Sequence, residues 1–325
     1  MIKAVMLYFG NNMMASESHL YPDFLERNKD NRKARRHRVA ETKFLFDYDI
    51  WKEATELMRR GGLNTVLVEL SEGVVYPSHP ELAVEGSWEP TRLQDELKRL
   101  RKMGLDPIPK LNFSTSHCAW QKRWRRLTST PEYYRFCADV IGDVCDIFEK
   151  PSHFHIGMDE EWATSQEFEP MMILRQGYLW RHDCRFLINE VEKRGARCMM
   201  WSDWLRNHPD ICTQHIPKSV LIQNWYYAEL FNPAEFPPRT PNFNPLGYYA
   251  YKTLDDLGYD QCPTGSNWCG PRNMGMTVRH CLKTIAPERL KGFMAAPWMR
   301  TLPENRTRIM DGISQLVEAL KEAGA

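Results

Sequence analysis

The sequence predicts an α/β fold of the (β/α)8 TIM-barrel type, as a single domain over residues 1–325 with a long loop after the first strand. Three observations support this prediction. The length suits one large barrel, strand-like and helix-like segments alternate along the chain, and polar and aromatic residues follow several of the strands directly. Functional groups of such barrels lie at the C-terminal ends of the strands, so these residues indicate where a site should form.

Eight β-rich runs can be assigned as strands. They are Ala4–Phe9, Thr65–Leu70, Pro107–Phe113, His153–Met158, Arg197–Trp201, Val220–Trp225, Leu246–Tyr251 and Phe293–Trp298. An open doubly wound sheet is the alternative architecture. It would carry a glycine-rich phosphate loop after a strand, and neither a G-x-G-x-x-G nor a Walker pattern is present. A closed barrel is therefore the preferred interpretation.

Helices between the strands are predicted from apolar residues at helical spacing, and several end in the same way. Arg59–Gly62, Arg101–Gly104 and Lys193–Gly195 each place cations in a last helical turn and glycine just after it. Cations suit the negative end of a helix, and glycine adopts the left-handed closing conformation at little cost. A β-rich run follows each time, which is typical of a mainly parallel sheet.

Composition excludes several function classes. Lys+Arg number 43 and Asp+Glu 42, so no overall field favours nucleic acid or a membrane surface. No run approaches the ~20 apolar residues of a membrane span, and Met1–Phe9 is interpreted as a strand rather than a signal peptide. Nine cysteines without a C-x-x-C pair argue against a disulfide framework or zinc site. We expect a cytoplasmic protein without cofactor or metal; the sequence does not indicate its oligomeric state.

The long first connection contains a basic segment from Arg27 to Arg38. One interpretation is a solvated helix or loop. The other is a basic flap over the barrel mouth that recognises an anionic group of the substrate.

The densest group of polar residues follows the fourth strand, where Asp159, Glu160 and Glu161 are consecutive. Adjacent acids repel one another, which raises at least one carboxyl pKa unless cations or hydrogen bonds intervene. Carboxyls in different protonation states are used for acid/base chemistry on a glycosidic bond. We expect Glu160 to be less solvated than Glu161, to have a raised pKa and to serve as the acid. A solvated acidic turn is the alternative.

The other strand ends supply ten expected substrate-binding residues. They are Glu69, Asn112, His117, Trp201, Asp203, Trp225, Tyr226, Tyr227, Trp298 and Arg300. Aromatic faces suit the mixed apolar and hydroxyl surface of a sugar ring. Packing of the barrel against its helices explains any single tryptophan equally well, but the whole set favours an aromatic-walled pocket for a carbohydrate.

The run His155-Ile156-Gly157-Met158-Asp159-Glu160 resembles the His-x-Gly-Gly-Asp-Glu signature of family 20 glycoside hydrolases, the β-hexosaminidases. The resemblance implies a retaining mechanism in which the 2-acetamido oxygen of the substrate is the nucleophile. Glu160 is then the general acid/base, and Asp159 orients the acetamido group. It also implies a pocket wall of Trp201, Trp225 and Trp298, with Tyr226 or Tyr227 donating to the acetamido oxygen.

Several positions depart from the family pattern. Met158 replaces the second glycine, no arginine follows the first strand, and Trp298-Met299-Arg300 replaces the usual Trp-x-Glu. In 112–117 only His117 is retained from the Pro-Gly-His of the third strand. The catalytic pair is thus kept and the sugar clamp rebuilt, so we expect a substrate other than a plain terminal N-acetylhexosamine, an acidic one included.

Other mechanisms remain open from the sequence. No carboxylate ends the predicted seventh strand, where many retaining barrel glycosidases keep their nucleophile, so Asp203 or Glu69 could act as a second carboxylate with Glu160. An inverting or elimination mechanism could use Glu160 with Asp203, Glu69 or His117. A non-catalytic carbohydrate-binding protein is a further alternative. A metal enzyme could use His153 and His155 with the acids, although no spacing is diagnostic for a metal.

Overall fold

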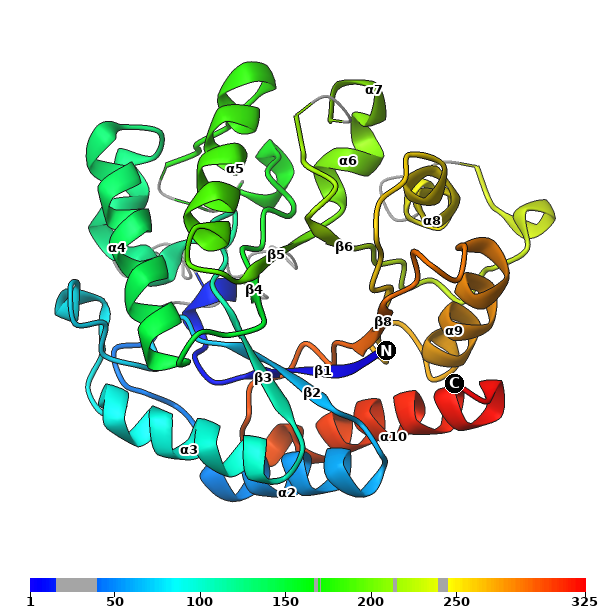
Figure 1. The fold of residues 1–325 in the computed structure, drawn as a ribbon, viewed down its shortest axis with the longest axis horizontal. Coiled ribbons are helices and arrows are strands. Elements are labelled where there is room, and N and C mark those ends of the chain that lie inside the picture. The colour runs from blue at the N-terminus through cyan, green and yellow to red at the C-terminus, as the bar shows by residue number, and fades with distance from the viewer. Residues whose placement is uncertain (16–39, 167–168, 170, 213–214, 239–244) are drawn as a thin grey trace, which may run out of the picture.

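The barrel architecture predicted from the sequence is confirmed. The computed structural model describes residues 1–15, 40–166, 169, 171–212, 215–238 and 245–325. Within them eight parallel strands form a nearly closed barrel, and the main helices surround it in chain order (Figure 1). The basic segment from Arg27 to Arg38 lies outside the described residues, so both of its interpretations stay predictions.

The strands follow one another around the barrel in chain order. They are β1 (Ile2–Tyr8), β2 (Thr65–Glu69), β3 (Asp106–Lys110), β4 (His153–His155), β5 (Arg197–Trp201), β6 (Leu221–Gln223), β7 (Thr264–Gly265) and β8 (Gly292–Ala295). β1 pairs with both β2 and β8. Between β6 and β7, Cys262 N donates to Ile222 O at 2.9 Å and Thr264 N to Asn224 O at 2.8 Å, which brings the ends of the sheet together.

The helices begin and end at recognisable signals. They are α2 (Tyr48–Arg60), α3 (Pro90–Lys102), α4 (Pro131–Ile147), α5 (Gly177–Glu192), α6 (Asp203–Asn207), α7 (Pro209–Cys212), α8 (Leu246–Asp256), α9 (Asn273–Thr284) and α10 (Arg306–Ala323), with 3-10 turns that include η5 (Ala119–Leu127). The Asp47 and Thr130 side chains cap α2 and α4. Gly62, Gly104 and Gly195 adopt positive φ at the predicted joints. No helix in the described ranges is both long and apolar enough to cross a membrane.

The predicted seventh strand, Leu246–Tyr251, is wrong, because this segment begins helix α8. Its buried residues Gly247, Ala250, Tyr251 and Leu254 recur every three to four positions, which is a helical period. The actual β7 has two residues and lies beyond Gly258, which ends the helix region with φ +76°. Ser266-Asn267-Trp268 follows β7, so the corrected strand also ends without a carboxylate.

Alternation along the strands separates two apolar cores. In β1 and just after it, Val5, Leu7 and Phe9 pack in the larger core between strands and helices, whereas Met6 and Tyr8 belong to a smaller core inside the barrel. This period of two is the geometry of a strand buried on both faces. The smaller core inside the barrel also includes Trp201, and Trp225 and Trp298 pack against this core. The barrel interior therefore opens into an aromatic mouth at the C-terminal ends of the strands.

Candidate active site

The acidic turn, residues 157–161 after β4, has an unusual backbone. Gly157, Met158 and Glu160 all have positive φ, at +75°, +72° and +54°. A Cβ on Gly157 would lie 1.9 Å from Asn112 Oδ1, so only glycine fits there. Met158 takes the same left-handed conformation in place of a second glycine. Such backbone costs about 1–3 kcal/mol at a non-glycine residue, and the surrounding structure must hold it.

The segment 112–117 after β3 supplies much of that support. Asn112 Nδ2 donates to Asp159 Oδ1 at 2.8 Å, and the Ser114 hydroxyl donates to the Asp159 carbonyl. The Ser116 hydroxyl donates to the Glu160 carbonyl at 2.5 Å. Sequence reasoning selected Asn112 but missed both serines. Their alternation after a predicted strand end, as Ser-Thr-Ser, was the available signal.

His117 lies between the two catalytic candidates. Its Nε2 is 3.2 Å from Glu160 Oε2 and 3.5 Å from Asp159 Oδ2. Burial alone would lower the pKa of His117, but the charges of Asp159 and Glu160 and the hydrogen bond to Glu160 raise it to about 9. The imidazole is therefore protonated at neutral pH and gives the two carboxylates a shared cation.

The expectation that Glu160 is less solvated than Glu161 and has a raised pKa is wrong. The Glu160 side chain is 34% exposed, whereas that of Glu161 is 2% exposed and forms an ion pair with Arg175. Burial acts to raise the pKa of Glu160, but the hydrogen bond and charge of His117, with a contribution from Arg206, lower it overall. The sequence did not show that cations would approach the two acids from other elements.

Asp203 lies buried after β5 and is also held by partners. It accepts hydrogen bonds from Arg206 Nη2 at 3.0 Å and from Trp225 Nε1 at 2.8 Å. Burial raises the pKa of Asp203 to about 6; Arg206 opposes the shift, and the charges of Asp159 and Glu160 reinforce it. The Arg206 guanidinium also lies 4.1 Å from the centre of the Trp225 ring. Asp203 thus lies at the site, and with Arg206 it holds the Trp225 ring in place.

Four predicted aromatic residues meet at the mouth. The ring centres of Trp201 and Trp298 are 5.8 Å apart, and those of Trp225 and Tyr227 are stacked at 5.2 Å. Trp298 Nε1 donates to the Tyr227 hydroxyl oxygen at 2.9 Å, which joins the two pairs. Tyr8, at the end of β1, contacts Trp298 edge-on. Rings from four separate strand ends therefore form a continuous wall.

Of the two tyrosines predicted as donors, only Tyr227 belongs to this wall. Tyr226 donates its hydroxyl hydrogen to Leu230 O and packs against Phe231 and Tyr248, so it does not join the pocket. Adjacent residues of an extended segment point to opposite sides, which explains the separation. Burial raises the pKa of Tyr227 well above its ordinary value, and its hydroxyl accepts from Trp298, so its own proton remains for another acceptor.

Glu69 is not a free second carboxylate. It forms a completely buried ion pair with Lys110 and accepts a hydrogen bond from Ser71 Oγ at 2.8 Å. His155 Nδ1 accepts the Gly157 N–H at 2.9 Å, and its Nε2 is buried without a hydrogen-bond partner among the described residues. These groups fill the barrel interior below the mouth, where they support the site rather than extend it.

The remaining predicted residues are placed as follows. Arg300 forms an ion pair with Glu41 at 2.7 Å, so its charge is balanced within the protein. His153 lines a depression at the N-terminal end of the strands, apart from the acids, which removes the metal set that combined it with His155. The potential ligand atoms of His117, Asp159 and Glu160 lie within 4.8 Å of one another. Among the described residues, these three form the group that could hold a metal ion.

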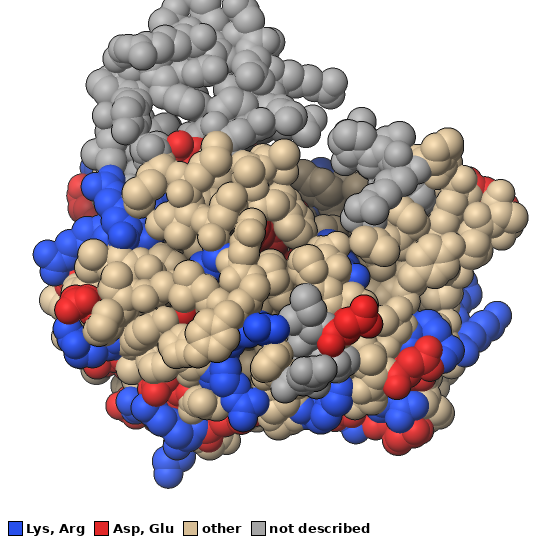
Figure 2. Space-filling model, turned by 90° about the horizontal axis from the view of Figure 1, so that it is seen from above, with Lys and Arg blue, Asp and Glu red and all other residues tan. Residues whose placement is uncertain are grey.

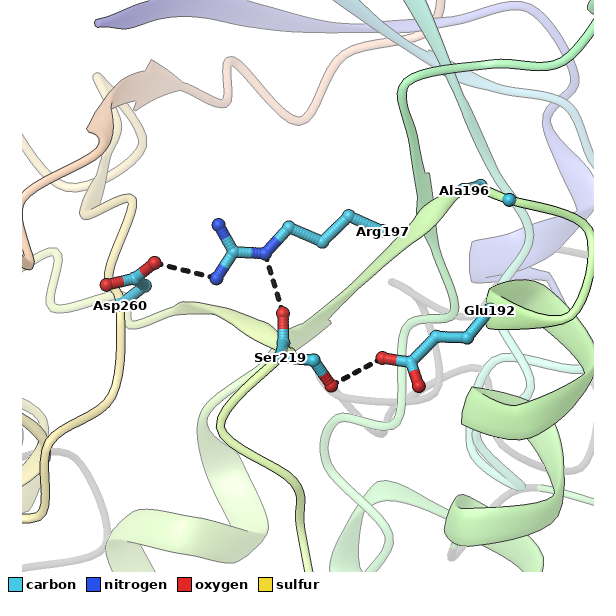
Figure 3. A pocket seen from close by; sticks show the side chains of 6 residues that line it. Glu192, Ala196, Arg197, Ser219 and Asp260 are labelled. Atoms are coloured by element: carbon cyan, nitrogen blue, oxygen red, sulfur yellow. Dashed lines mark hydrogen bonds and ion pairs between the residues drawn. The ribbon is translucent and has the colours of Figure 1, made fainter.

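An open surface depression of about 540 Å³ lies at the opposite end of the barrel (Figure 3). Arg197, at the start of β5, donates to Asp260 at 2.7 Å and to the Ser219 carbonyl at 2.6 Å, and Ser219 Oγ donates to Glu192 at 2.5 Å. The charged groups of this depression thus have protein partners, and this end of such barrels serves stability.

On the face shown in Figure 2, cationic and anionic side chains are interspersed.

The fold and the mouth define a (β/α)8 barrel with an acidic, aromatic-walled site of the kind found in carbohydrate-active enzymes. Residues 77–235 match the family model "Glycosyl hydrolase family 20, catalytic domain". A curated relative, the chitooligosaccharidolytic β-N-acetylglucosaminidase of Bombyx mori, is 21% identical in an alignment of 286 positions that covers 72% of this chain and 47% of the relative. The chain therefore spans about half the length of that relative.

Solved structures of family 20 enzymes share the fold. The β-N-acetylhexosaminidase of Bacteroides fragilis superposes with a TM-score of 0.59 at 13% identity, covering 84% of this chain and 63% of its own. The N-acetyl-β-hexosaminidase of Streptomyces plicatus gives 0.58 at 12% identity, covering 96% and 62%. The family model thus matches just under half of the chain, and the solved structures share its barrel fold.

Proposed function

We propose that this chain is a glycoside hydrolase that cleaves the O-glycosidic bond of a 2-acetamido sugar with retention of configuration. Glu160 acts as general acid and then as general base. Asp159 orients the acetamido group, whose oxygen attacks the anomeric carbon. The observation that carries this proposal is the His117 imidazole, one nitrogen of which faces both Asp159 and Glu160.

A nucleophile from the substrate is favoured because the other acids near the mouth are already engaged. Glu161 is paired with Arg175, Glu69 with Lys110, and Asp203 with Arg206 and Trp225. A retaining mechanism with a protein nucleophile needs a second carboxylate about 5 Å from the acid and free to attack. The charge of Glu160 helps to raise the pKa of Asp203, so Asp203 is the residue to test for an inverting mechanism.

His117 and Glu160 together supply the catalytic proton. In the resting site the imidazolium is hydrogen-bonded to the Glu160 carboxylate. Transfer of that proton from Nε2 to Oε2 gives a neutral acid without uptake from solvent, and this acid can protonate the leaving oxygen. The resulting carboxylate can then take a proton from the water that opens the cyclised intermediate. We assign the acetamido oxygen to the Tyr227 hydroxyl, whose oxygen accepts from Trp298 Nε1 and whose own proton can be donated.

The substrate we propose is a neutral sugar. Arg300 was one reason to expect an acidic one, and Glu41 already balances its charge at 2.7 Å. The other reason, a basic flap from Arg27 to Arg38, lies outside the described residues and stays a prediction. The aromatic wall is the principal contact surface. We further propose a reducing, cytoplasmic location; it rests on the cysteine pattern alone.

A pair of matched aryl glycosides tests the proposed reaction. We expect release of the aryl alcohol from a β-glycoside with a 2-acetamido group, and a rate at least a hundredfold lower when the 2-position carries a hydroxyl, because the nucleophile is then absent. Efficient cleavage of the 2-hydroxyl substrate with inversion, followed by NMR of the anomeric product, would assign Asp203 as base. Binding of both sugars without turnover would identify a carbohydrate-binding protein.

A further inference from the structure

The third acid of the turn, Glu161, belongs to a buried ionic network that faces away from the mouth. Its carboxylate is paired with the Arg175 guanidinium and accepts the backbone N–H of Thr115 at 3.1 Å. Arg175 Nη1 reaches Asp183 Oδ2 on α5 at 3.3 Å. The Glu161, Arg175 and Asp183 side chains are 1–2% exposed. The Arg175 guanidinium thereby joins the turn after β4 to helix α5, and Glu161 links both to Thr115 in the segment after β3.

The network is also fixed at its outer end. Asp183 accepts hydrogen bonds from Ser129 Oγ at 2.6 Å and from the Tyr134 hydroxyl at 2.5 Å, both near the start of α4. Arg175 Nη2 donates to the Phe113 carbonyl at 2.8 Å, next to the segment that supports the acids. Each carboxylate therefore has several donors, as a buried ion requires.

This attachment lies one residue beyond a strained position. Glu160 has φ +54°, and the Glu161 side chain fixes the chain immediately after it. The contact of Glu160 with His117, at 3.2 Å, depends on where that strained residue is held. A released Glu161 would let residue 160 relax toward an ordinary backbone conformation and carry its carboxylate away from His117.

We infer that Glu161, Arg175 and Asp183 are positioning residues that hold Glu160 in its reactive geometry, while Glu161 itself takes no part in the proton transfer. This inference deepens the proposed function and rests on it. It assigns different roles to three consecutive acids: Asp159 orients the substrate, Glu160 transfers the proton, and Glu161 anchors the turn.

The test compares Glu161→Gln with a matched control. A second buried pair joins Arg125 of η5 to Glu169 at 2.8 Å; Glu169 lies in the same connection between β4 and α5 as Glu161, and its carboxylate is paired away from Asp159 and Glu160. Both variants should lose thermal stability. Only Glu161→Gln should lower kcat, by about ten- to a hundredfold with KM changed less than about threefold, since displacement by about 1 Å has effects of this size.

A second readout does not require turnover. The imidazole pKa of His117, followed by NMR in the whole protein, should fall in Glu161→Gln by about one unit or more as Glu160 moves away, and should not change in Glu169→Gln. Arg175→Lys, which keeps the charge but loses the fork of donors, should give the same changes more weakly and serves if Glu161→Gln does not fold. Equal effects of the Glu161 and Glu169 variants on kcat and on the His117 pKa would overturn the inference. Absence of hydrolysis by the unaltered protein would instead reject the proposed function.

Discussion

At the residue scale, Glu160 experiences two opposing effects. Burial disfavours its charged form, and the imidazolium of His117 favours it more strongly, so that its pKa falls below the ordinary value. A general acid with a low pKa would be deprotonated at neutral pH if no other group could supply its proton. The charge of Asp159, together with the hydrogen bond and charge of Glu160, raises the pKa of His117 to about 9 against the effect of burial, which stores the missing proton one hydrogen bond away.

This pairing predicts the alkaline limit of activity. The site retains its shared proton while the pH is below the pKa of His117 and loses it as the pH rises through about 9. The value of kcat/KM should therefore fall tenfold per pH unit above about 9. In His117→Gln, Glu160 must hold the proton alone, and the limit should move toward the carboxylic acid range. An unchanged alkaline limit in that variant, in a full pH–rate profile, would contradict the shared proton.

Removal of the acid itself gives a second prediction. Glu160→Gln keeps the shape of the side chain but cannot transfer a proton, so turnover of a substrate with a poor leaving group should fall by about 10²–10⁴-fold. An aryl glycoside with a good leaving group needs less protonation and should be affected much less in the glycosylation step. The comparison uses pre-steady-state rates for both substrates. Equal losses for the two leaving groups would assign the acid to another residue.

At the element scale, the sequence predicted the joints better than the strands. Glycine after a pair of cations located the ends of α2, α3 and α5, because left-handed closure depends on one residue, although in α5 the cations Lys193 and Arg194 follow the last helical residue, Glu192. β7 was missed since a two-residue strand has no period to detect, and the tyrosines of Leu246–Tyr251 favoured strand over helix. The glycine rule, applied to Gly258, would have located the end of the α8 segment.

The candidate site was also predicted in part, because only some of its residues have a local sequence signal. Asp159, Glu160 and His117 carry local signals at predicted strand ends. Arg175, which pairs with Glu161, comes from a loop, and Arg206, which pairs with Asp203 and whose charge lowers the pKa of Glu160, comes from a short helix. The direction of both arginines is set by tertiary packing. The prediction that Glu160 has a raised pKa was wrong for that reason. The pKa depends on cations from other elements, and no local sequence pattern shows where these lie.

The barrel elements β2 and β3 share a buried pair that gives a stability prediction. Lys110→Met leaves the Glu69 carboxylate buried without its cation and should destabilise the fold by about 3–5 kcal/mol. Glu69→Gln combined with Lys110→Met removes both charges and should recover most of that loss. Urea unfolding of the two proteins measures the difference. A double variant as unstable as the single one would show that the loss comes from packing of Lys110 and not from its charge.

At the scale of the whole molecule, the barrel brings together groups that are distant in sequence. Tyr8, His117, Glu160, Asp203 and Trp298 come from five different strand ends, and the parallel order of the sheet places all five at one end of the barrel. The opposite end carries internally paired charges around Arg197 (Figure 3). One end of the fold is thus available for chemistry while the other contributes to its stability.

Inhibition by a thiazoline analogue of the cyclised 2-acetamido sugar tests the central claim most directly. A site complementary to the transition state binds such an analogue far more tightly than the substrate. We predict an inhibition constant at least a hundredfold below KM for the unaltered protein, and a marked weakening in Asp159→Asn, which no longer supplies the charge that favours the oxazolinium-like intermediate. Indifference to the thiazoline, together with hydrolysis of a 2-hydroxyl glycoside, would contradict substrate assistance.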